Sequence, residues 1–270
     1  MSSQRNDLGS DNINKSKNTR IDFSRQPNNM DYRKDEIMHI GRYWNGVKTM
    51  QDLSSRLKRP IRILDIGCGE MNTARMFNSS VVVKKSSVIE KYIGVDIDYK
   101  MAENAMATYA GYKTLNASYH IQDMTVNSHL PFPDGHFDLI ICFEFMEHIQ
   151  PKFLPAILQE AKRLLNPEGE ALFSTPNSNG SNEELPKDHI YEYSFEECVT
   201  LFLQAGFTIT EAMGTCVNIT KMPKEERVKL DQILKRFYSA FGKNSPFAAV
   251  ASAPLFNPKY CKNVIYHLSR

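Results

Sequence analysis

Acidic side chains follow short apolar runs at points where a nucleoside could bind. In residues 62–69 (RILDIGCG), an apolar strand delivers Asp65 and then a Gly-x-Gly turn at Gly67 and Gly69. Glycines permit backbone angles and close contacts that a Cβ forbids. A helix from about Asn72 would turn its first N–H groups toward a ligand. Because Gly-x-Gly alone also occurs in ordinary tight turns, the elements that follow decide the interpretation.

Two further acids stand where ribose and adenine need partners. Residues 91–98 predict a second buried strand, and Asp96 near its end can accept hydrogen bonds from both ribose hydroxyls. Asp98 is better placed to cap a helix that starts near Tyr99. Asp123 follows another short apolar strand and suits an adenine amino group. The sequence therefore predicts an adenosine site.

In this order, the motifs resemble those of the class I S-adenosylmethionine-dependent methyltransferases. The resemblance spans about residues 62–207 and includes the Pro-Phe-x-Asp-Gly-x-Phe-Asp-Leu block at 131–139. Met71 stands where the family often has a third glycine, and Asn72 replaces the last glycine of a dinucleotide fingerprint, which disfavours a nicotinamide-dependent oxidoreductase. The resemblance implies cofactor contacts from Asp65, Gly67, Cys68, Gly69, Asp96, Ile97, Asp123, Met124 and Phe143.

Methyl transfer to a hydroxyl or amine requires removal of a proton, and Glu147 and His148 follow the predicted strand over residues 137–143. We expect His148 to be the general base with Glu147 beside it. The alternative is that both only cap or orient the loop.

The same segment resembles the divalent-metal set of small-RNA 3′-terminal 2′-O-methyltransferases and, in part, of ubiquinone-biosynthesis O-methyltransferases. Carried over, the ligands are Glu144, Glu147, His148 and His189. Mixed carboxylate and imidazole ligands suit Mg²⁺, Mn²⁺ or Zn²⁺, which would orient and acidify an acceptor oxygen. Many family members carry Glu-His here without a metal, so both versions stay open.

The elements that position these groups indicate an α/β fold, a doubly wound, seven-stranded, mostly parallel, Rossmann-like sheet. We expect a disordered tail over 1–29, a helical N-terminal lid over 30–58, and a methyltransferase domain over 59–270 with a helical cap insertion over 221–260. The remaining expected elements are a helix from Tyr99 stopped by Gly111, a helix over 154–165 closed by 166–169, strands over 170–175, 207–213 and 263–268, and helices over 193–206, between Ser194 and Gly206, and 225–241.

Apolar positions over residues 30–57 recur at helical spacing, which predicts two helices or one bent helix. As a lid over the cofactor cleft, this segment would offer Tyr32, Arg42, Tyr43 and Trp44 to the substrate. The alternative is that Trp44 anchors the helix to the sheet.

Composition narrows the remaining choices. The chain has 270 residues, 41% of them hydrophobic, which is ample for a packed core. A net charge of +2 gives no electrostatic case for nucleic acid, although it does not exclude it. Five scattered cysteines suit a reducing compartment, so we expect a cytoplasmic protein. Neither a signal peptide nor a membrane span is expected.

These patterns predict an enzyme that uses S-adenosylmethionine to methylate a hydroxyl or amine of a small molecule. A nucleotide or RNA 2′-O acceptor ranks second and a protein third, because fold alone does not select the acceptor. The alternative of another class is a non-catalytic S-adenosylmethionine-binding partner subunit.

Overall fold

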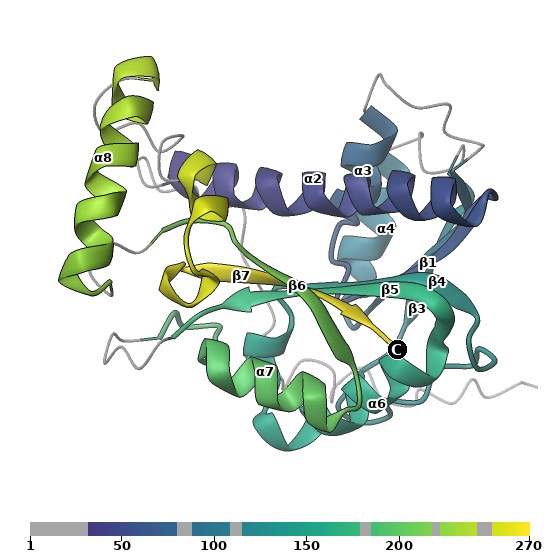
Figure 1. Cartoon of the computed structure of the whole chain (residues 1–270). Coiled ribbons are helices and arrows are strands. Elements are labelled where there is room, and N and C mark those ends of the chain that lie inside the picture. Colours follow the sequence, from purple (N-terminus) through teal and green to yellow (C-terminus); the bar gives the residue numbers. More distant parts are fainter. Residues whose placement is uncertain (1–31, 80–87, 109–114, 179–184, 218–221, 242–249) are drawn as a thin grey trace, which may run out of the picture.

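Seven strands form one mixed sheet in the computed structural model, which describes residues 32–79, 88–108, 115–178, 185–217, 222–241 and 250–270 (Figure 1). The strand order is β3-β2-β1-β4-β5-β7-β6. Strands β1 to β5 run parallel, while β7 is antiparallel to both β5 and β6. This arrangement confirms the predicted doubly wound sheet. The strands are β1 Ile61–Ile66, β2 Ile89–Asp96, β3 Ala117–Ile121, β4 Phe137–Phe143, β5 Leu165–Pro176, β6 Thr208–Gly214 and β7 Asn263–Ser269.

Helices cover both faces of the sheet (Figure 1). On one face lie α2 (Tyr32–Leu57), α3 (Asn72–Ser79) and α4 (Tyr99–Thr108), and on the other α6 (Leu154–Leu164) and α7 (Phe195–Gln204). Successive strand residues point to opposite faces, so Leu139 and Ile141 join the core under α2 whereas Ile140 and Cys142 join the core under α6. Both faces of the central strands are therefore buried, as parallel sheets require.

The insertion before β7 has a small apolar core of its own. It contains α8 (Lys224–Phe241), which lies beyond the end of the sheet at the left of Figure 1, and the short helical turns η5 (Ala253–Leu255) and η6 (Pro258–Tyr260). Leu230 and Leu234 of α8 pack with Phe256. Asn177, directly after β5, donates hydrogen bonds from Nδ2 to the carbonyls of Lys259 and Cys261, both at 3.0 Å. The insertion is thereby fastened to the central sheet.

Most predicted elements occur where the sequence indicates, with differences in detail. Ser194 caps α7 in a reciprocal capping box with Glu197, and Gly206 follows with a φ of +82°. Asp98 caps α4 through bonds from the N–H groups of Lys100 and Met101. Gly111 and residues 1–29 lie outside the described residues, as do parts of the insertion.

The predicted boundary between α6 and β5 is wrong. Residues 166–169 do not close the helix, because Leu165 is already extended and β5 runs from Leu165 to Pro176. Gly169 is needed for close strand packing and not for a helix stop: a Cβ there would lie 2.6 Å from the carbonyl oxygen of Asp138.

Helix α2 is one continuous helix whose second half belongs to the core. Val47, Met50 and Leu53 are buried against the sheet. Trp44 is 50% exposed, so the interpretation of Trp44 as the anchor is wrong. The side chain of Tyr32 lies outside the described part of the chain. Among the described residues, no helix combines the length and the apolarity that crossing a bilayer requires.

Candidate active site

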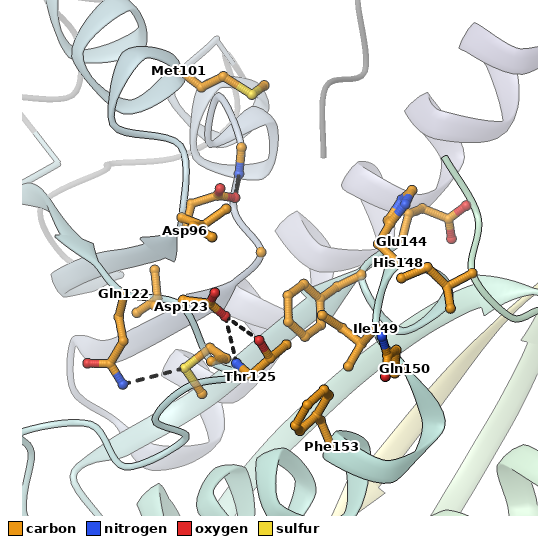
Figure 2. A pocket seen from close by; sticks show the side chains of 17 residues that line it. Asp96, Met101, Gln122, Asp123, Thr125, Glu144, His148, Ile149, Gln150 and Phe153 are labelled. Atoms are coloured by element: carbon orange, nitrogen blue, oxygen red, sulfur yellow. Dashed lines mark hydrogen bonds between the residues drawn. The ribbon is translucent and has the colours of Figure 1, made fainter. Parts of the chain in front are cut away.

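A cavity of about 280 Å³ opens at the carboxyl ends of β1 to β4, where ligands of open α/β sheets bind (Figure 2). Figure 2 shows Asp96 and Asp123 on one side of it, with Glu144 and His148 on the other. Predicted residues that line the cavity are Gly67, Gly69, Asp96, Ile97, Asp123, Met124, Glu144 and His148. The lining residues not predicted are Val95, Met101, Gln122, Thr125, Phe145, Ile149, Gln150, Phe153 and Ile190.

The glycine loop turns as the sequence predicts. Gly67 has a φ of +68° and Gly69 of +48°. A Cβ on Gly67 would lie 2.5 Å from the Phe145 ring, so glycine is required for space as well as for conformation. Met71 adopts a φ of +54° with its side chain fully buried. The loop thus keeps a left-handed residue where the family often has its third glycine.

Asp96 braces this loop from the end of β2. Its Oδ2 accepts from the Gly69 N–H at 2.8 Å, and its Oδ1 accepts from the Asp98 N–H at 2.9 Å. Burial raises the pKa of Asp96, while the backbone donors act in the opposite direction. The carboxylate keeps lone pairs free for hydroxyl donors in the cavity.

Asp123 follows β3 and is held by its own loop. Its Oδ1 accepts from the N–H of Thr125 at 2.8 Å and from the Thr125 hydroxyl at 2.7 Å (Figure 2). Met124 beside it is buried and adds an apolar surface. This side of the cavity combines one acceptor group with apolar contacts, as a purine base requires.

Three residues of the predicted cofactor set do not line the cavity. Asp65 is buried beneath the loop and accepts a 2.5 Å hydrogen bond from the Tyr92 hydroxyl. Burial raises the pKa of Asp65 to about 7. Cys68 lies against Gly94, and the Phe143 ring packs against Gly46 of α2. Asp65, Cys68 and Phe143 therefore pack behind the glycine loop, on the side away from the cavity, and support its conformation.

His148 is oriented by the backbone of a distant loop. Its Nδ1 lies 2.8 Å from the carbonyl oxygen of Asp188. Because a carbonyl only accepts, Nδ1 carries a proton, and in the neutral ring the lone pair is on Nε2. Nε2 lies 4.0 Å from Oε1 of Glu147. The geometry gives His148 the tautomer that a general base needs.

Glu147 is 1% exposed and accepts a 3.1 Å hydrogen bond from the Thr175 hydroxyl. Burial, followed by the neighbouring charge of Glu144, raises the pKa of Glu147 well above its usual value. Its carbonyl accepts from the N–H groups of Ile190 and Tyr191, at 2.7 and 3.2 Å. These bonds bring the loop after β5 back over the end of β4.

That loop brings His189 to Glu147 and His148. One ligand atom from each residue lies within 4.8 Å of the others. His189 Nδ1 lies 2.7 Å from a carboxylate oxygen of Glu192, which directs the lone pair to Nε2. Both imidazoles are thus held by their Nδ1 atoms.

Glu144, the fourth residue of the predicted metal set, is engaged elsewhere. Its Oε1 lies 2.6 Å from the Arg42 guanidinium and 2.9 Å from the Ser174 hydroxyl, and its Oε2 accepts from Asn263 Nδ2 at 2.7 Å. Arg42 is buried in this network. Arg42, Tyr43 and Trp44 are not among the described residues that line the cavity.

Comparisons with known proteins agree with this architecture. A family model described as a methyltransferase domain matches residues 39–212, more than half of the chain. The ubiquinone biosynthesis O-methyltransferase of Neisseria meningitidis is 26% identical over 147 residues, which are 54% of each chain. That of Coxiella burnetii is 26% identical over 151 residues, 51% of this chain and 58% of its own. The chain thus spans little more than half the length of these curated relatives.

Solved structures share the fold. The S-adenosylmethionine-dependent methyltransferase from Mesorhizobium loti superposes with a TM-score of 0.54 at 15% identity, covering 84% of this chain and 97% of its own. This likeness agrees with the family match over residues 39–212 on the fold. The chain belongs to the methyltransferase domain family and has the fold of the class I S-adenosylmethionine-dependent methyltransferases.

Proposed function

We propose that this protein transfers a methyl group from S-adenosylmethionine to a hydroxyl or amine of a small molecule. The observation that carries the proposal is one cavity with nucleoside-type groups on one side and His148 on the other. The residues fit the cofactor, because Gly67 and Gly69 bring bare backbone to the cavity wall and Asp96 offers acceptor oxygens inside it. When bound, S-adenosylmethionine supplies an electrophilic methyl group.

The residues around the cavity have different roles in the proposed reaction: cofactor binding, proton removal and exclusion of water. Asp96 accepts hydrogen bonds from the ribose, and Asp123 with Met124 holds the base. His148 Nε2 takes the proton that the acceptor loses, while the Asp188 carbonyl holds the ring. The buried Ile149 and the partly buried Phe145 and Phe153 give this side of the cavity an apolar surface that restricts water around the acceptor.

Calorimetry tests the cofactor assignment directly. S-adenosylmethionine and its demethylated product S-adenosylhomocysteine should bind, and NAD should not, because the loop lacks the third dinucleotide glycine. Binding of NAD with no binding of S-adenosylmethionine would overturn the proposal.

Two observations support a small-molecule acceptor: the names of the curated relatives and the low net charge of the chain. The two O-methyltransferases named above act in ubiquinone biosynthesis. A net charge of +2 supplies little attraction for a polyanion. A nucleic acid therefore ranks second, and its salt-dependent binding to the protein would favour it.

As the alternative use of the His148 Nε2 lone pair, we propose a divalent cation held by Glu147, His148 and His189; in that version His148 is a ligand and does not take the proton. The support is the proximity of their ligand atoms, together with the Nδ1 contacts of His148 and His189, which leave Nε2 of each ring as the atom available to a metal. A bound Mg²⁺, Mn²⁺ or Zn²⁺ would supply positive charge that lowers the pKa of an acceptor hydroxyl.

Calorimetric titration with each metal distinguishes a metal-binding site from a metal-free site in which His148 is the general base. Binding should be lost in His189→Ala and retained in His120→Ala, a histidine outside this group. In parallel, a chelator should abolish methyl transfer and leave S-adenosylmethionine affinity within about twofold. Activity that survives both chelator and His189→Ala would leave His148 as a simple base.

We further place the protein in the cytoplasm. All five cysteines lie in described segments and none forms a disulfide, which supports a reducing compartment. Fluorescent tagging of the full chain in its host checks this placement.

A further inference from the structure

Glu144 has a backbone conformation that its side-chain partners must maintain. Its φ of +50° lies in the left-handed region, which non-glycine residues rarely adopt. Its N–H donates to the Ser174 carbonyl at 2.9 Å. Its carboxylate accepts from Arg42, Ser174 and Asn263. Residues of α2, β5 and β7 therefore converge on the residue that follows β4.

Arg42 supplies the charge in this network. Its side chain is 3% exposed, and it reaches Glu144 at 2.6 Å and also contacts His39 on the preceding turn of α2. A buried charge that loses its partner is strongly destabilising. The two residues consequently hold each other in place.

The segment that Glu144 directs forms one side of the cavity. Phe145, His148 and Ile149 line it within five residues (Figure 2 labels Glu144, His148 and Ile149). The Phe145 ring lies against Gly67 of the cofactor loop. A change in the backbone of Glu144 would therefore displace the aromatic contact and the base together.

We infer that Arg42 is a positioning residue: through its buried ion pair with Glu144, it fixes the turn that carries Phe145 and His148 against the cofactor loop. Glu144 is then a structural partner of Arg42 and not a metal ligand, since the described group of neighbouring ligand atoms comprises Glu147, His148 and His189, while the Glu144 carboxylate is held by Arg42, Ser174 and Asn263. This inference rests on the proposed function for its kinetic consequence.

Conservative variants test the pair. Arg42→Lys and Glu144→Gln should each lower kcat by about 10- to 100-fold while S-adenosylmethionine affinity changes by less than about threefold. The double variant should be no worse than the poorer single variant, because both disturb one interaction. The matched control is Arg56→Lys. Arg56 is on the same helix as Arg42, and its half-exposed side chain forms an ion pair with Glu170 of β5, so this variant should keep kcat within about twofold.

Hydrogen exchange provides a readout that needs no turnover. Amides of residues 144–149 should exchange at least about tenfold faster in Arg42→Lys than in the wild type, and no faster in Arg56→Lys. Metal titration completes the set, since loss of metal binding in Glu144→Gln with normal binding in Arg42→Lys would make Glu144 a ligand and overturn the inference.

The outcomes for the two proposals are separable. Wild-type protein that binds S-adenosylmethionine but never transfers its methyl group contradicts the proposed function, and the exchange rates still decide the inference. Unchanged exchange at residues 144–149 in a folded Arg42→Lys variant contradicts the inference, whatever the activity.

Discussion

At the scale of single residues, Asp96 serves both the loop and the expected ribose. Asp96→Ala should weaken S-adenosylmethionine binding by about 2–3 kcal/mol, because it removes charge-assisted hydrogen bonds to two hydroxyls. Asp98→Ala is the control: it removes the α4 cap at a cost of about 1 kcal/mol in stability and should leave affinity nearly unchanged. Calorimetry on both variants checks this. Equal affinity in wild type and Asp96→Ala would remove Asp96 from the site.

The raised pKa of Asp65 predicts that the free energy of unfolding depends on pH. Its pKa rises from an ordinary 3.8 to about 7 in the folded protein, so its contribution is complete below pH 3.8 and is lost as the pH rises to about 7. Asp65→Asn removes this titration and keeps an acceptor for Tyr92. The free energy of unfolding of wild type minus that of Asp65→Asn should therefore fall between pH 4 and 7 and level off above it. Urea denaturation of both proteins measures the difference, and a flat difference would contradict the assignment.

The sequence predicts the polar residues of the cavity better than the apolar ones. Asp96 is the last residue of β2, Asp123 and His148 come shortly after β3 and β4, and all three line the cavity, so their polar groups at strand ends could be recognised in the sequence. Phe153 and Ile190 line it too, but an apolar side chain has the same signature in a core. The partner of Glu144 lies 102 positions earlier at Arg42, so only the fold reveals that Glu144 is engaged.

At the scale of elements, helix α2 offers a direct test of which side chains anchor a helix to the sheet. Met50 is fully buried between the helix and the sheet, whereas Trp44 on the same helix is half exposed. Met50→Ala should cost about 2–5 kcal/mol of stability through lost burial and a cavity, and Trp44→Ala less than about 0.5 kcal/mol. Chemical denaturation measures both. A larger loss in Trp44→Ala would restore it as the anchor of the helix.

The lid over residues 30–58 stays a prediction for its first half. The spacing of apolar residues predicts a helix there, but spacing does not say which layer the helix joins. Val47 and Leu53 pack in the core, so deletion through Leu57 should unfold the protein as well as abolish turnover. The start of β5 is a second place where the local sequence misleads. The Pro-Glu-Gly run at 167–169 predicts a turn, but pairing with β4 keeps this segment extended.

At the scale of the whole molecule, the topology is what assembles the site. Parallel strands bring Gly67, Asp96, Asp123 and His148 to one edge, and the loop after β5 adds His189. The doubly wound sheet was predictable because the strands that end in acidic residues occur in family order. The return of the loop was implied only by the resemblance that groups His189 with Glu147 and His148, because the bonds that hold it are backbone bonds to Glu147.

Methyl transfer itself is the most direct test of the central claim. Protein incubated with methyl-labelled S-adenosylmethionine and the small-molecule, RNA and protein fractions of a cell extract should label the small-molecule fraction. His148→Ala should reduce that transfer by about 10²- to 10⁴-fold, while His136→Ala, outside the cavity lining, should not. Label in RNA or protein instead, or no transfer by a protein that binds S-adenosylmethionine, would contradict the account.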